Sequence, residues 1–264
     1  MIAAFRSELV KLLRLATVAG YATAAAGFTV MLTVVTIINA DNPSGHGPAN
    51  RSIDLTQLAE PAGYLAGFES ASGFLGIVAL ALFASSVAAE FSTGTIRALL
   101  VIDSRRRQLL AGKTVGLAAL LVIVITVAAV IGAIVAFAIG GAQGVNTNAW
   151  TTASALTDGA AIIANAALAT VVWGLFGGLL AMLTRSAAIS IAAGVAYFLI
   201  GEQLILHSLW PSTADWLPAG VLDTLAQGGT DTRGYTAALG LTALYALAVY
   251  TATTTTFERR DVTD

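Results

Sequence analysis

The chain has 264 residues, of which 57% are hydrophobic and only 11% are charged, and its net charge is −2. Soluble domains carry about 25% charged residues, so a water-soluble fold of this length could not hide so much apolar surface. The composition therefore predicts an integral membrane protein. The absence of cysteine excludes disulfides, thiolate metal sites and cysteine catalysis. No basic, aromatic patch points to a nucleic acid partner.

The first fourteen residues, MIAAFRSELVKLLR, have the pattern of an amphipathic helix. Their apolar side chains share one helical face, and polar side chains surround it, among them Arg6, Glu8, Lys11 and Arg14. This pattern suits a helix that lies in the membrane interface of the lipid bilayer. A cytoplasmic lead-in that only orients the first span is the alternative.

Six apolar runs follow, and about 20 residues suffice to span a bilayer. The expected spans are residues 15–38, 68–89, 108–138, 159–183, 187–206 and 235–256. The first run is longer than the apolar core of a signal peptide, about 7–15 residues, so we expect it to be retained. The sequence thus predicts one all-α transmembrane domain over residues 1–264, with six spans.

Three outer loops separate the spans, at residues 39–67, 139–158 and 207–234. The first is broken by prolines and glycines, with a short helix expected around residues 55–60. Within the third, residues 210–229 either dip back into the outer leaflet as a gate or cap the surface. Gly112/Gly116 and Gly174/Gly178 are small-xxx-small pairs that allow close approach of helices.

Lys and Arg set the orientation. With the N-terminus inside, eleven of the thirteen basic residues fall on the cytoplasmic side, and only Arg51 and Arg233 fall outside. Such a bias is the positive-inside rule. We therefore expect a multi-pass protein of the plasma membrane with both termini in the cytoplasm.

Residues 90–113, EFSTGTIRALLVIDSRRRQLLAGK, are the most densely charged stretch and link the second and third spans. Its middle predicts a short helix at about residues 93–103, with Thr93 or Thr95 as N-cap. Side chains at helical spacing form one face, namely Ile96, Leu99, Leu100 and Asp103, while Arg97 is turned away. Asp103 and Ser104 offer a second N-cap, so a new helix should begin near Arg105.

No catalytic or metal site is expected in this chain. Residues 111–114, AGKT, resemble the end of a phosphate-binding loop, but Arg107 occupies the place of the first glycine. His46 and His207 are far apart in sequence and have no second ligand at helical spacing.

Ionisable groups inside spans are costly to bury and are usually functional. Glu202, near the outer end of the fifth span, is the main example, and Glu69 lies at the outer end of the second. Glu202 either lines or gates a path, or occupies an interfacial position. Asn165, Tyr197 and Gln203 are polar enough to line a translocation path, or to hold helices together.

Four segments together resemble a known family: SELVKLLR at residues 7–14, EFSTGTIRALL at 90–100, Arg105 with Gly112 and Lys113, and FERRD at 257–261. This set resembles the membrane subunit, or permease, of ABC-two class ATP-binding-cassette exporters. The most specific part is the Glu-x-x-x-Gly-Thr-x-Arg pattern of Glu90, Gly94, Thr95 and Arg97. The chain departs from the family in one place, since Asp103 stands where a proline usually precedes the Ser-Arg pair.

The resemblance implies a function and partners. Two six-span halves, identical or paralogous, would pair with two cytoplasmic ATPase subunits, which bind the ATP and magnesium. The helix at 93–103 would be a coupling helix seated in a cleft of the ATPase. Its contact residues would be Glu90, Thr93, Gly94, Thr95, Ile96, Arg97, Leu99, Leu100 and Asp103. Arg105, Arg106 and Arg107 would anchor the third span at the membrane surface.

The resulting hypothesis is an exporter of drugs, peptides or lipid-like amphiphiles that works by alternating access. An ion-coupled secondary carrier is one alternative, and the scarcity of buried charges argues against it. A non-transporting membrane scaffold or sensor subunit is the other.

Overall fold

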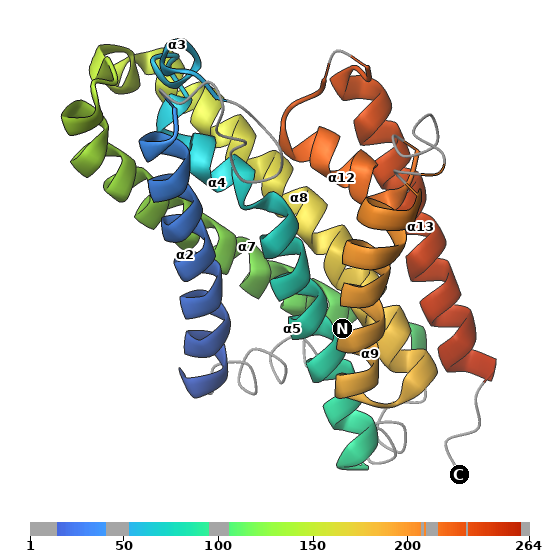
Figure 1. The fold of residues 1–264 in the computed structure, drawn as a ribbon. Coiled ribbons are helices and arrows are strands. Elements are labelled where there is room, and N and C mark those ends of the chain that lie inside the picture. The colour runs from blue at the N-terminus through green and yellow to red at the C-terminus, as the bar shows by residue number, and fades with distance from the viewer. Residues whose placement is uncertain are drawn as a thin grey trace.

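The computed structural model describes residues 15–40, 53–94, 106–206, 209, 216–230 and 232–259. All regular secondary structure within these residues is helical (Figure 1). The elements are α2 (Leu15–Ile38), α3 (Leu55–Leu58), η2 (Gly63–Leu65), α4 (Ala66–Ser70), α5 (Ser72–Ser92), α7 (Arg106–Gly140), η3 (Gly141–Gln143), η4 (Thr147–Thr151), α8 (Ala153–Thr184), α9 (Ala187–Ala196), η5 (Tyr197–Leu206), α12 (Pro218–Ala226) and α13 (Tyr235–Arg259).

Five of the described helices are long and apolar enough to cross a membrane: α2, α5, α7, α8 and α13. They run alongside one another in the bundle (Figure 1). The protein is therefore an all-α, multi-pass membrane protein, as the composition predicts. The expected fifth span, residues 187–206, consists of α9 followed by the π-helix η5, each ten residues long.

Some helices begin at other residues than the predicted spans. The first span is α2, with the predicted bounds. The second begins at Ser72, because residues 66–70 form the separate helix α4. The fourth begins at Ala153 instead of 159, because the Thr152 hydroxyl accepts a hydrogen bond from the Ala155 amide (3.3 Å) and caps the helix. The predicted outer loop at 139–158 is shorter for this reason, and it contains η3 and η4.

The core of the bundle is the contact between α5 and α8, the most extensive between any two described elements. Glycines make it possible. A Cβ atom at Gly177 would lie 2.2 Å from the Leu80 carbonyl oxygen, and one at Gly174 would lie 2.6 Å from the Phe83 ring. A Cβ at the predicted contact residue Gly178 would meet nothing closer than 3.8 Å. The closest approach is thus at Gly174 and Gly177, three residues apart, while Gly178 faces the same helix with more room.

A second close contact joins α2 to α4 and α7. A Cβ at Gly67 of α4 would lie 2.2 Å from the Thr33 Cα, and one at Gly132 of α7 would lie 2.6 Å from the Thr29 methyl group. Small residues allow backbones to approach closely inside a membrane, where the hydrophobic effect does not drive helices together. Helix α2 is thereby held against the rest of the bundle.

One end of the molecule is closed by short elements. The Asp54 carboxylate caps α3 and accepts hydrogen bonds from the Thr56 hydroxyl (2.6 Å) and the Gln57 amide (2.8 Å), which lower its pKa. The Trp150 indole donates to the Leu58 carbonyl (2.8 Å). Its ring also packs edge-on against Phe137. The predicted short helix at 55–60 is α3, shorter by two residues.

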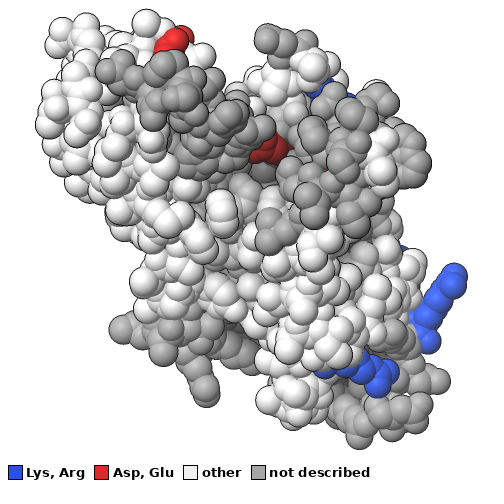
Figure 2. Space-filling view, in the orientation of Figure 1, with Lys and Arg blue, Asp and Glu red and all other residues white. Residues whose placement is uncertain are grey.

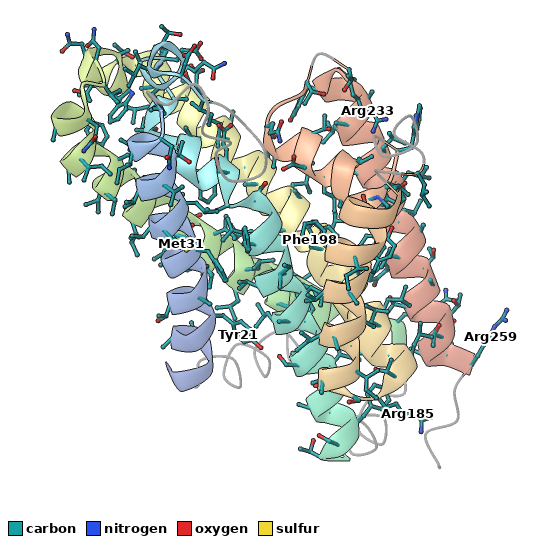
Figure 3. The ribbon with its side chains drawn as sticks, viewed as in Figure 1. Tyr21, Met31, Arg185, Phe198, Arg233 and Arg259 are labelled. Carbon is teal, nitrogen blue, oxygen red and sulfur yellow. The ribbon has the colours of Figure 1, made fainter. Side chains whose placement is uncertain are left out.

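Charged side chains gather near the two ends of the bundle. Arg185 and Arg259 lie towards one end and Arg233 towards the other (Figure 3). On the face shown in Figure 2, a broad surface without charged groups separates these ends. Such an uncharged belt is the surface expected where lipid tails surround a protein.

Candidate functional site

The candidate site is the end of the bundle where α5 stops and α7 starts. The Thr93 hydroxyl donates to the Ala89 carbonyl (2.7 Å) at the last turn of α5, and Gly94 then takes a left-handed conformation with φ 66°. Glycine adopts this conformation without steric cost, so it is the usual residue after a helix C-cap. The helix therefore runs past the expected end at residue 89 and ends at Ser92, with Thr93 as its C-cap and Gly94 turning the chain away.

A buried ion pair joins the two helices at this end. The Lys113 Nζ lies 2.9 Å from Glu90 Oε1, and it also donates to the Ser86 carbonyl (3.0 Å). The exposed fractions of the two side chains are 5% for Lys113 and 11% for Glu90. Lys113 of α7 therefore makes two contacts with the C-terminal part of α5, one with Glu90 and one with Ser86.

This geometry changes the expected role of Glu90. The sequence placed it in the connecting stretch as an ATPase contact, but it lies within α5 and faces Lys113. Helix α5 can continue past Glu90 because Lys113 balances its charge inside the bundle. The sequence signal for the pair was the presence of opposite charges on the facing ends of two successive spans.

A small cavity of about 20 Å³ adjoins the ion pair, lined by α5, α7, α8 and α13, with Lys113, Thr114 and Tyr250 among its residues. One water molecule needs about 10–15 Å³. The cavity therefore has room for one water molecule and not for a substrate.

A second ion pair connects the start of α7 with the end of α13. The Arg107 guanidinium binds the Glu258 carboxylate with two donors, Nε to Oε1 and Nη2 to Oε2 (3.1 Å). Both side chains are accessible to solvent, so the pair orients the helices more than it stabilises them. Arg107, expected as a membrane-surface anchor, thus anchors α7 to the C-terminal helix. The side chain of Arg106 lies outside the described residues.

The turn between α8 and α9 meets α5 at the same end. Arg185 ends α8 with φ 56°, and its guanidinium lies 5.9 Å from the centre of the Phe91 ring. The Ser186 hydroxyl then caps α9 by accepting from the Ile189 amide (3.4 Å). The very short turn predicted at Arg185 is confirmed.

The rest of the predicted contact segment lies outside the described residues. This concerns Thr95, Ile96, Arg97, Leu99, Leu100, Asp103 and Arg105, and likewise the interfacial residues Arg6, Glu8, Lys11 and Arg14. The structure therefore describes the two helices that frame the predicted coupling helix.

The residues expected to line a path lie towards the other end, and they make different contacts. Asn165 of α8 accepts from the Tyr235 hydroxyl (3.0 Å), which ties α8 to the start of α13. Glu202 is buried, and one of its oxygens accepts from the Gly220 amide of α12 (3.0 Å). Tyr197 is 41% exposed, and its hydroxyl interacts with the Glu202 carboxylate. The side chain of Gln203 lies outside the described residues. These contacts form no common polar channel among the described residues.

The fold and these sites define a multi-pass helical membrane protein whose second and third long helices are locked together by a buried ion pair. The chain belongs to the protein family described as "Protein of unknown function (DUF2705)", whose profile matches residues 56–263. The matched range contains Glu90, Lys113 and Glu202. No curated protein matches the chain.

Proposed function

We propose that this protein is the membrane-spanning subunit of an ATP-driven exporter and that residues 93–103 are the coupling helix that contacts a separate ATPase. The observation that carries the proposal is the buried pair of Glu90 and Lys113, which fixes α5 and α7 to each other on either side of that segment. The ion pair joins the two helices that flank this segment, so a force that reached either helix through the segment would be shared by both.

The packing provides routes from those helices into the bundle. Helix α5 is in backbone contact with α8 at Gly177, and α7 is tied to α13 through Arg107 and Glu258. Packed helices transmit small shifts because close-packed interiors deform little. Closure of an ATPase against the coupling helix would therefore reach α8 and α13 as well.

The proposed topology has six spans, with α9 and η5 together as the fifth. About 20 residues suffice for a span, and the α8–α9 turn places Arg185 at the same end as the α5–α7 ion pair. Arg259 lies towards that end too (Figure 3). The positive-inside rule makes this end cytoplasmic, where an ATPase that binds ATP and magnesium would reach it. A second copy or a paralogue would complete the transporter.

The direct test is assembly with an ATP-binding-cassette protein encoded beside this one. The two proteins would be co-expressed and purified through a tag on the membrane subunit. We expect the double variant Arg97→Glu/Leu100→Asp to lose most of the co-purified ATPase, because it reverses the charge and polarises the apolar face of the coupling helix. Arg259→Glu, an exposed change at the same end but outside the segment, is the matched control. Full retention of the ATPase by the double variant would contradict the proposal.

Glu202 favours a second candidate, a proton-coupled carrier. Such carriers use carboxylates that are buried in the membrane and exchange protons. Glu202 is 3% exposed, and its Oε2 atom makes no hydrogen bond of good geometry. Transport that depends on a proton gradient and not on ATP would favour this candidate over the exporter.

A further inference from the structure

Glu202 is held in an unusual position between two helices. Its Oε1 atom accepts from the Gly220 amide in the first turn of α12 (3.0 Å), a helix whose own N-cap residue, Leu217, supplies no side-chain cap. A carboxylate is stabilised at a helix N-terminus by the free amides and the helix dipole. Glu202 therefore caps α12 from η5, with one of its two oxygens.

The other oxygen lacks a well-aligned partner. Glu202 is only 3% exposed, and its Oε2 atom makes no hydrogen bond of good geometry, although the Tyr197 hydroxyl interacts with the carboxylate. A buried polar atom without a partner is costly, and the cost is larger for a group that carries charge. Proteins retain such groups where a ligand completes them.

A series of aromatic rings begins on the side of η5 that carries Glu202. Phe198 precedes Glu202 by four residues in the π-helix η5, about one turn of such a helix, so the two residues share a side. Figure 3 shows Phe198 in the middle of the bundle, and its ring packs edge-on against Trp173 of α8 at 5.3 Å. The series continues through Phe176 to Tyr245 of α13, with ring centres 5.9 and 6.5 Å apart.

The chemistry of these groups limits the classes of ligand that could bind here. A divalent metal ion is disfavoured, because the described residues contain no cluster of three or more His, Cys, Asp or Glu side chains. An anion is excluded because Glu202 itself occupies the N-terminus of α12. A carboxylate next to the faces and edges of aromatic rings suits an organic cation, which gains both an ion pair and cation–π contacts.

We propose that Glu202 and the rings of Phe198, Trp173 and Tyr245 bind the cationic group of a hydrophobic organic cation, with Oε2 as the counter-charge. This assigns the substrate class of the proposed exporter and so rests on that function. Because Glu202 is buried under α12, the cation reaches it when α12 moves away from η5. Helix α12 is therefore the gate, and the Glu202–Gly220 hydrogen bond is the contact that closes it.

The test is equilibrium binding of radiolabelled tetraphenylphosphonium to the purified chain in lipid nanodiscs, without ATPase or ATP. We expect saturable binding to the wild type, and a rise of about ten-fold or more in Kd for Glu202→Gln. Glutamine keeps an oxygen acceptor for the Gly220 amide, so the variant loses the charge while α12 stays capped. Glu69→Gln, an acidic residue of α4, is the matched control and should bind like the wild type.

Two results would overturn the inference: no saturable binding to the wild type, or equal binding to the wild type and Glu202→Gln. Should Glu202→Gln fail to fold, competition with the neutral analogue triphenylphosphine oxide tests the site in the wild type alone. Displacement of the cation by this analogue at equal concentration would contradict a charged site. The binding assay contains no ATPase. Its failure therefore leaves the exporter proposal intact, and loss of ATPase assembly leaves this site intact.

Discussion

At the level of single residues, this protein differs from a bundle with a wholly apolar interior because it buries charged side chains. Lys113 and Glu90 are both nearly inaccessible, yet they bind each other at 2.9 Å. Burying a charge costs several kcal/mol, and a partner repays that cost only when the geometry is good. The pair is therefore better explained by the need to lock α5 to α7 than by stability alone.

A double-mutant cycle tests this lock. Glu90→Gln leaves the Lys113 ammonium buried without its counter-charge, and we expect it to lower the free energy of unfolding by about 3–5 kcal/mol. Lys113→Met is the other single variant, and Glu90→Gln/Lys113→Met, which removes both charges, should recover most of the loss seen with Glu90→Gln. Thermal unfolding in one detergent measures all variants. Losses that simply add in the double variant would show that the two residues act independently.

The sequence revealed some of these residues and not others. Glu202 could be identified because it is an acid within an apolar run, but its partner Gly220 could not, since it lies 18 positions further along the chain on another helix. The stretch around Glu90 was recognised from its motif. Lys113 was missed as its partner, because the charge density of residues 90–113 made all its members look like surface residues.

At the scale of elements, the α5–α8 contact determines whether force at one end reaches the rest of the bundle. Gly177→Ala would place a methyl group 2.2 Å from the Leu80 carbonyl oxygen, a backbone atom that cannot turn away. We expect this variant to lose about 1–3 kcal/mol, as overpacked cores do. Gly178→Ala, one residue further on, has 3.8 Å of room and should lose nothing. Thermal unfolding of the pair is the measurement, and equal melting temperatures would contradict the contact.

The long helices could be predicted from the sequence, and the short ones mostly could not. A long run without charged residues or proline predicts α2, because nothing in it interrupts the helical hydrogen bonding. The split between α4 and α5 at Ala71 lies among Glu69, Ser70 and Ser72, but polar residues there fit the outer end of one span as well as a break between two helices. For residues 210–229, which contain α12, the sequence predicts only a gate or a cap. The contacts of the apolar face of α12 could not be predicted, because they depend on the placement of α5, α8 and α13 beside it.

At the scale of the whole molecule, the two ends have separate tasks in this account. One end carries the ion pairs of the helices that flank the proposed coupling helix, and the other carries Glu202 under α12. The glycine-mediated packing of α5 on α8 lies between them. An exporter needs this arrangement, because the energy is supplied at one side of the membrane and the gate opens on the other.

The central claim is that ATP hydrolysis by a partner drives transport through this protein. The most direct measurement is uptake of tetraphenylphosphonium by inverted vesicles that contain the chain with its ATP-binding-cassette partner. We expect uptake that requires ATP and both proteins. This uptake should persist when an uncoupler collapses the proton gradient, and it should fall by about ten-fold with Arg97→Glu/Leu100→Asp. Uptake by the chain alone, driven by a proton gradient and abolished by the uncoupler, would contradict it.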